Sequence, residues 1–189
     1  GACSPRFSIL ELVSRISVVK TRPLYLVGMM GAGKSTVGPR LAARLGRAFI
    51  DTDHEIERRA GRKIPDIFEA EGEAHFRALE VEAIEIASSN AAVIALGGGA
   101  IAQPGMAERL SKQGLVVWLK ADASVLLERI GSGASRPLLA GLDRNAQLDK
   151  LQALSEERRP AYEQAEIVAD ASRAADAIVD EIVAALHAR

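Results

Sequence analysis

One glycine-rich segment carries the clearest chemical signal in the sequence: Gly28–Ser35, which reads Gly-Met-Met-Gly-Ala-Gly-Lys-Ser. It fits the phosphate-binding pattern G-x-x-x-x-G-K-S, follows the β-rich run Leu24–Val27 and opens into a helical pattern, which is the context such a loop requires. Its backbone N–H groups can surround phosphates, Lys34 can reach the β- and γ-phosphates, and Ser35 can ligate Mg²⁺. We therefore expect a nucleoside triphosphate here. The strand before the loop and the helix after it disfavour the alternative, an ordinary glycine-rich turn.

Two carboxylates, Asp51 and Asp53, follow the short β-rich run Ala48–Ile50. Phosphoryl transfer needs a neutralised phosphate and an oriented nucleophile. One carboxylate could hold Mg²⁺ while the other approaches the hydroxyl that accepts the phosphate. The alternative is that Asp53 simply caps a helix, because aspartate is a common N-cap residue. Capping and catalysis are compatible.

A run of three glycines, Gly97–Gly99, follows another β-rich run, Ala92–Leu96. A strand end without side chains lets another group approach the backbone closely. Taken alone, such a run is as often a loose turn as a binding site. It becomes informative only because it lies where a parallel sheet is expected to bind its ligand.

Three arginines are candidates for binding anions: Arg77, Arg136 and Arg158. Each, taken singly, is more often a solvated surface residue than part of a site. A guanidinium in a mobile segment is well suited to close over transferring phosphate, and a forked guanidinium elsewhere can bind a carboxylate with two hydrogen bonds. Arg136 lies in the expected lid and suits the first role, whereas the residues alone leave the roles of Arg77 and Arg158 open.

The elements that position these residues alternate between strand and helix. Five short apolar runs predict strands: Leu24–Val27, Ala48–Ile50, Ala92–Leu96, Leu115–Leu119 and Glu166–Ala169. The segments between them have apolar residues every three or four positions, which predicts helices. This order predicts an α/β protein with a three-layer α/β/α P-loop NTPase fold and a central five-stranded parallel sheet, whose ligands bind at the carboxyl ends of the strands. Two irregular regions predict a substrate-binding helical insertion at about 53–80 and a mobile lid at about 131–145.

Length and composition predict one enzyme-sized domain with no general affinity for polyanions. The chain has 189 residues, of which 48% are hydrophobic and 26% charged, and 24 basic against 25 acidic side chains give a net charge of −1. We therefore expect a single P-loop kinase domain over residues 23–189 that binds neither nucleic acid nor membranes. Cys3 is the only cysteine, so no intramolecular disulfide can form, and we expect a cytoplasmic protein.

The first residues, 1–22, are expected to form an extension of the domain. Ile9, Leu12 and Ile16 fall on one face of a helix, while Glu11 and Arg15 interrupt the apolar stretch that a signal peptide would need. We expect a short amphipathic helix that packs on the body of a monomer. The alternative is that this helix is a surface for self-association or for a partner.

Taken in order, the motifs resemble those of the shikimate kinase family from about Leu24 to the C-terminus. The resemblance rests on segments in the family's order and at compatible spacings: Gly28–Thr36, Asp51–Asp53, Gly72-Glu73 with Phe76-Arg77, Gly97–Ala100, Arg136–Leu139 and Arg158–Tyr162. The chain departs from the family's common form mainly in its first 22 residues. Arg159 directly follows Arg158 and could point inward in its place, although the register from Pro160 and Tyr162 favours Arg158.

The resemblance implies a role for each of these positions. ATP would be bound by residues of the phosphate loop and by three arginines. The loop residues are Gly31, Ala32, Gly33, Lys34, Ser35 and Thr36, and the arginines are Arg129, Arg136 and Arg173. Within that set Arg129 would stack on adenine with Arg173 as its partner, and Ser35 with Asp51 would hold Mg²⁺. Shikimate would be bound by Asp53, Arg77, Gly97, Gly98, Gly99 and Arg158, and Lys34, Asp53 and Arg136 would be the catalytic groups.

The resemblance also implies a reaction: ATP-dependent phosphorylation of the shikimate 3-hydroxyl, giving shikimate 3-phosphate and ADP, a step of chorismate and aromatic amino-acid biosynthesis. We expect direct transfer without a covalent enzyme intermediate. Two alternatives remain open at this point: another small-metabolite kinase resembling gluconate kinase, and a non-catalytic module that senses ATP. The three arginines and the triple glycine favour shikimate over the first alternative, and Asp53 with the carboxylate-binding arginines disfavours the second.

Overall fold

One parallel sheet forms the centre of the protein. The structure is a computed structural model, and it describes residues 21–131 and 138–189. The sheet has the order β2-β3-β1-β4-β5 and contains β1 (Leu24–Val27), β2 (Phe49–Asp51), β3 (Val93–Ala95), β4 (Leu115–Lys120) and β5 (Ile167–Asp170). All its pairings are parallel. The predicted five-stranded parallel sheet is confirmed, and each strand ends within one residue of its expected position.

The central strand aligns the functional loops. β1 is fully buried between β3 and β4, and Leu24 pairs with Val93 on one side and with Leu115 on the other. On the far side of β3, Asp51 of β2 pairs with Ala95. Because parallel strands in this register end at the same edge of a sheet, the segments that follow β1, β2 and β3 must emerge side by side.

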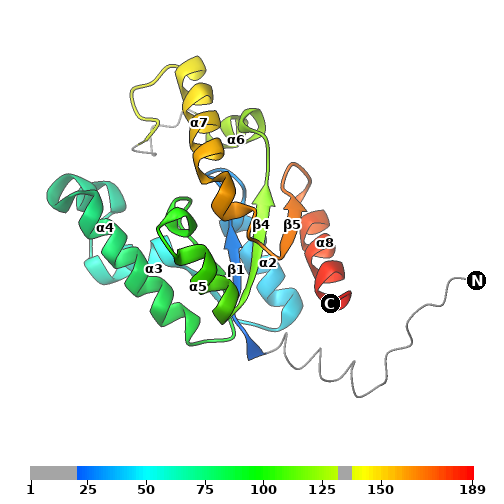
Figure 1. Cartoon of the computed structure of the whole chain (residues 1–189). Coiled ribbons are helices and arrows are strands. Elements are labelled where there is room, and N and C mark those ends of the chain that lie inside the picture. The colour runs from blue at the N-terminus through cyan, green and yellow to red at the C-terminus, as the bar shows by residue number, and fades with distance from the viewer. Residues whose placement is uncertain (1–20, 132–137) are drawn as a thin grey trace, which may run out of the picture.

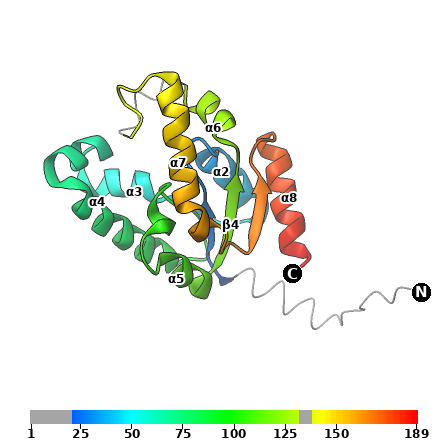
Figure 2. The ribbon, with the colours of Figure 1, turned by 45° about the horizontal axis from the view of Figure 1, so that its top comes forward.

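Helices cover both faces of the sheet, which makes the three layers (Figures 1 and 2). One face carries α2 (Lys34–Leu45) and α8 (Ala175–His187), and the other carries α5 (Met106–Gln113), the short η1 (Ala100–Ala102) and the long α7 (Arg144–Tyr162). α6 (Ala123–Ile130) packs against α7 beyond the end of β4. α8 buries Ile178, Val179, Ile182 and Leu186, so its apolar stripe is core packing, as the period of its sequence predicts.

Two helices occupy the region where an insertion is expected. α3 (Thr52–Ala60) and α4 (Ile64–Ser88) pack on each other around a small core of their own: Ile56, Ile67, Phe76 and Ala83. Gly72 interrupts the helical geometry of α4 with φ 80° and ψ 174°. A glycine adopts this conformation at no steric cost, so the helix changes direction there while remaining packed on α3.

Some of the expectations lie outside the described residues. They are the amphipathic helix before residue 21 and the part of the lid that contains Arg136. The described end of the lid region is anchored, because Leu139 is fully buried and Gln147 of α7 donates a hydrogen bond to its carbonyl. Among the described helices, none has the length and apolar character to cross a membrane.

Candidate active site

The phosphate-binding loop between β1 and α2 has the backbone shape that its glycines predict. Gly28, Gly31 and Gly33 have φ angles of 145°, 79° and 90°, a region that residues with a side chain rarely adopt. Gly28 also lies so close to β4 that a Cβ would come within 2.6 Å of the Leu119 carbonyl oxygen. The loop therefore needs glycine both for its conformation and for its close packing.

Two side chains of this loop lie where a phosphate and a metal ion would need them. The Lys34 ammonium donates to the carbonyls of Gly28 and Met29, at 2.7 and 3.0 Å, and so lies across the loop. The Ser35 hydroxyl donates to Oδ2 of Asp51 at 2.8 Å. A hydroxyl and a carboxylate this close together suit Mg²⁺, which typically takes one or two protein oxygens and completes its shell with phosphates and water.

Asp51, and not Asp53, caps the helix after β2. Its Oδ1 accepts the backbone N–H groups of Asp53 and His54, at 3.1 and 3.4 Å, at the start of α3. The alternative that Asp53 is only the N-cap is therefore wrong. The carboxylate of Asp53 instead points to the glycine run after β3, where a Cβ on Gly97 would lie 2.8 Å from its Oδ1.

Charged side chains from three helices converge on the glycine run Gly97–Gly99. A Cβ on Gly97 would come within 2.4 Å of Oε1 of Glu80, in addition to Asp53. A Cβ on Gly99 would meet both terminal nitrogens of Arg77 at 3.1 Å, and one on Gly98 would lie 3.6 Å from Nη1 of Arg158. The space of a side chain at Gly97 is thus taken by two carboxylates, from α3 and α4, and that at Gly99 is crowded by the Arg77 guanidinium, while Arg158 of α7 lies at ordinary contact distance from the place of a Cβ on Gly98. The run is a gathering point for charge, and it is more than a loose turn.

The glycine run and the phosphate loop touch each other. A Cβ on Gly98 would lie 3.3 Å from the backbone nitrogen of Met30 and 3.6 Å from the carbonyl oxygen of Gly28. Arg158, which reaches the run from α7, also points its Nη1 at the sulfur of Met29, 3.8 Å away. A triphosphate on the loop and a small anion on the run would therefore be neighbours, which is the arrangement that direct transfer between them needs.

Glu80 belongs to this cluster, although it was missed in the sequence. Its side chain is 1% exposed, and it accepts hydrogen bonds from Nη1 of Arg77 at 2.5 Å and from Nε2 of Gln103 at 3.1 Å. Burial raises the pKa of Glu80 and outweighs the opposite effect of Arg77. A charged residue on the core-facing side of α4, between Phe76 and Ala83, was the signal that could have revealed it.

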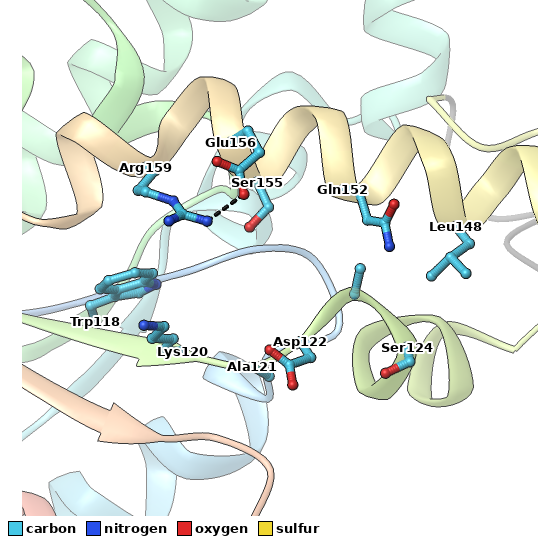
Figure 3. Close-up of a pocket in the computed structure, with 11 residues that line it drawn as sticks. Trp118, Lys120, Ala121, Asp122, Ser124, Leu148, Gln152, Ser155, Glu156 and Arg159 are labelled. Atoms are coloured by element: carbon cyan, nitrogen blue, oxygen red, sulfur yellow. Dashed lines mark hydrogen bonds and ion pairs between the residues drawn. The ribbon is translucent and has the colours of Figure 1, made fainter.

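Arg158 and Arg159 point in different directions from α7. Arg158 is 6% exposed and faces the glycine run, whereas half of the Arg159 side chain is exposed and pairs with Glu156. Figure 3 shows Arg159 at the edge of a hollow of about 450 Å³ between α7 and the ends of β4 and α6. Trp118, Lys120 and Asp122 also line that hollow, and the charged cluster around Gly97–Gly99 does not. This hollow is therefore separate from the candidate active site.

Two further arginines lie together beyond the phosphate loop. Arg129, near the end of α6, donates to the carbonyls of Ser172 and Arg173 at 3.3 and 3.5 Å, and Arg173 pairs with Glu181 at 3.1 Å. Nη1 of Arg129 lies 4.0 Å from the place of a Cβ on Gly33, so the pair borders the loop. The structure thus places Asp53, Arg77, Arg158 and the glycine run beside the phosphate loop and Arg129 at the border of that loop, while Arg136 lies outside the described residues.

A three-layer α/β/α fold with a phosphate loop beside a cluster of charged side chains is typical of P-loop kinases that act on small metabolites. Comparison with known proteins gives the particular family. A profile described as shikimate kinase matches residues 30–187. The chain belongs to the shikimate kinase family, and its reaction is the ATP-dependent phosphorylation of a hydroxyl group of shikimate.

Individual relatives agree with this assignment. A shikimate kinase of Nitrobacter winogradskyi is 47% identical over 92% of this chain and 81% of its own length, and one of Rhodopseudomonas palustris is 44% identical over 91% and 84%. A solved shikimate kinase from Acinetobacter baumannii, in complex with shikimate, superimposes with a TM-score of 0.81 at 41% identity, covering 89% of this chain and 94% of that one. A gluconokinase from Sinorhizobium meliloti reaches 0.53 at 21% identity, over 88% and 92%, which shows only a shared fold. The expected family, fold and reaction are confirmed.

Proposed function

We propose that shikimate binds at the glycine run, with its carboxylate between Arg77 and Arg158 and its reacting hydroxyl at Asp53. The observation that carries this proposal is the convergence of these three side chains on Gly97–Gly99, directly beside the phosphate loop. Two guanidinium groups can bind one carboxylate with paired hydrogen bonds and so orient the ring. Glu80 holds Arg77 in place from its buried side.

On the nucleotide side, we propose that the backbone from Gly31 to Thr36 binds the phosphates of ATP. Lys34 would move from the loop carbonyls to the β- and γ-phosphates, and Arg136 would approach them from the lid. Ser35 and Asp51 would hold Mg²⁺, which when bound neutralises phosphate charge. Arg129, with Arg173 beside it, would stack on the adenine ring.

Asp53 orients the attacking hydroxyl and accepts its proton in this account. The oxygen of the shikimate 3-hydroxyl then attacks the γ-phosphorus in line, the bond to the bridging oxygen of ADP breaks, and shikimate 3-phosphate forms. No covalent enzyme intermediate is needed, because the protein's contribution is positioning and charge neutralisation. Glu80 lies beside Asp53, and the negative charge of Asp53 adds to the burial that raises the pKa of Glu80.

We further propose that the protein acts as a monomer in the cytoplasm, without binding nucleic acid or membranes. The balanced charge of the chain and its single cysteine support this proposal. The mass of the full chain in solution, measured by analytical ultracentrifugation, tests whether the protein is a monomer. A dimer that dissociates when residues 1–20 are removed would favour self-association through the N-terminal segment instead.

A substrate panel tests the proposed function. ADP release from ATP and Mg²⁺ is followed in a coupled assay with shikimate, with gluconate and with no acceptor. We expect release that depends on shikimate and stops when Mg²⁺ is chelated. Release that depends on gluconate would support the related kinase, and ATP binding without any acceptor-dependent release would support the sensing module.

A further inference from the structure

Tyr162, at the end of α7, makes a hydrogen bond that no role in the reaction yet explains. Its side chain is fully buried, and its hydroxyl donates to the carbonyl oxygen of Gly98 at 2.6 Å. Burial raises the pKa of this phenol to about 12, so the hydroxyl keeps the proton that it donates. Tyr162 follows Arg158 by one helical turn, so the two side chains leave the same face of α7 and reach the same glycine.

This bond holds the one carbonyl of the glycine run that the local backbone leaves free. The carbonyl of Gly97 accepts the N–H of Ala100 at 3.0 Å, and that of Gly99 accepts the N–H of Ala102 at 3.2 Å, both within the turn that forms η1. The carbonyl of Gly98 accepts from a side chain 64 residues away. Glycine has the widest choice of backbone conformations, so a peptide between two glycines keeps one orientation only if something outside it holds it.

The ring of Tyr162 is itself held firmly. It stacks on Trp118 of β4, with ring centroids 5.5 Å apart and planes 15° from parallel. A rigid ring places its hydroxyl more accurately than a flexible polar side chain could. Because the peptide group is planar, fixing the Gly98 carbonyl also fixes the opposite direction of the Gly99 N–H.

We propose that Tyr162 is a positioning residue for the acceptor: its hydroxyl sets the Gly98–Gly99 peptide in the orientation that shikimate binding requires. The proposal rests on the assignment of the glycine run to the acceptor site. Tyr162 acts through the backbone of the run, while its hydroxyl also interacts with Arg158, and it touches neither ATP nor the reacting atoms. Loss of its hydroxyl should therefore weaken shikimate binding and leave ATP binding unchanged.

The test is Tyr162→Phe, with Tyr25→Phe as its matched control. Both tyrosines are fully buried and each hydroxyl donates one short bond, but that of Tyr25 goes to Ser88 at 2.7 Å, at the end of the sheet away from the phosphate loop. Phenylalanine preserves the ring and its packing, so both variants should fold and lose similar thermal stability. We expect Tyr162→Phe to raise the Kd and KM for shikimate by about 3- to 10-fold, with the KM for ATP unchanged. Tyr25→Phe should change neither.

Arg158→Lys, measured beside them, separates failure of this inference from failure of the proposed site. If Arg158→Lys weakens shikimate binding and Tyr162→Phe does not, the acceptor site stands and the positioning role of Tyr162 is wrong. If none of the variants affects shikimate binding, the site assignment is wrong and the inference fails with it. Equal weakening of ATP and shikimate by Tyr162→Phe would also overturn the inference, because it would show a general loss of structure.

Discussion

Two glycine segments meet in the active site, and they contain glycine for different physical reasons. In the phosphate loop, Gly28, Gly31 and Gly33 adopt positive φ angles. None of the glycines in the run Gly97–Gly99 does so. At Gly97 and Gly99 the run needs glycine because carboxylates and a guanidinium group from distant helices lie close to the place of a side chain.

The difference concerns what each segment can do by itself. The loop carries most of its chemistry in its own backbone and in the residues that directly follow it. The run supplies only room, and its chemistry comes from Asp53, Arg77, Glu80 and Arg158. Binding of the nucleotide should therefore respond to changes in backbone strain within one segment, whereas binding of shikimate should respond to side chains on α3, α4 and α7.

The largest effect is expected from Lys34→Ala, which removes the charged side chain of the phosphate loop. Turnover should fall by about 100- to 1,000-fold, because the developing charge on the transferred phosphate loses a preorganised cation. The melting temperature should be preserved. Lys112→Ala is the control, since that lysine is largely exposed and pairs with Glu108 of its own helix. Normal turnover in Lys34→Ala would remove this lysine from the phosphate site.

Gly97→Ala tests the crowded side of the comparison. The new methyl group would displace the carboxylates of Glu80 and Asp53, which lie 2.4 and 2.8 Å from its position. Overpacking of this kind costs about 1–3 kcal/mol, so kcat/KM for shikimate should fall by about 5- to 150-fold. ATP affinity, measured by titration of the enzyme alone, should change much less. An equal loss for both ligands would mean that the two glycine segments are not separate functions.

Arg158→Lys and Arg159→Lys form a matched pair on one helix. Lysine keeps the positive charge and loses the forked geometry that binds a carboxylate with two hydrogen bonds. We expect the KM for shikimate to rise by about 10-fold in Arg158→Lys and to stay unchanged in Arg159→Lys. The opposite ranking in steady-state kinetics would place Arg159 in the pocket.

Gly33→Ala tests the strained side of the comparison. Its neighbours lie no closer than 4.0 Å, so a methyl group has room, but φ of 90° is unfavourable for alanine by about 1–2 kcal/mol. The KM for ATP should rise by about 5-fold while the Kd for shikimate stays constant. A variant with unchanged ATP kinetics would show that the loop adapts without strain.

The smallest effect is expected from Glu73→Gln. Glu73 pairs with Arg77 at 2.9 Å, but two thirds of its side chain is exposed, so solvent screens the pair. The KM for shikimate should change by less than about 3-fold. Glu80→Gln, at the buried partner of the same arginine, should change it more. A larger effect for Glu73 would mean that the outer carboxylate is the one that orients Arg77.

Much of the fold could be predicted from sequence because its signals are local. Each strand is a short apolar run bounded by helical periodicity, and alternation of the two implies a parallel sheet with a known binding edge. The phosphate loop is contiguous, so one pattern identified all of its parts. The helix cap after β2 was assigned to Asp53 as an alternative, and the structure gives it to Asp51, because either residue has a side chain suited to capping.

The acceptor site was harder to predict because it depends on tertiary contacts. That Glu80 lies against Gly97, or that Tyr162 reaches Gly98, follows from how α4 and α7 pack on the sheet, and no local pattern encodes it. Family resemblance supplied Arg77 and Arg158 as candidates. Only the packing shows which of two adjacent arginines turns toward the glycine run.

A crystal structure of the enzyme with ADP, Mg²⁺ and shikimate tests the central claim most directly. We predict the shikimate carboxylate between the guanidinium groups of Arg77 and Arg158, over the glycine run, with a ring hydroxyl at the carboxylate of Asp53. Shikimate bound instead in the hollow beside Trp118 and Arg159, with the glycine run unchanged, would contradict the account.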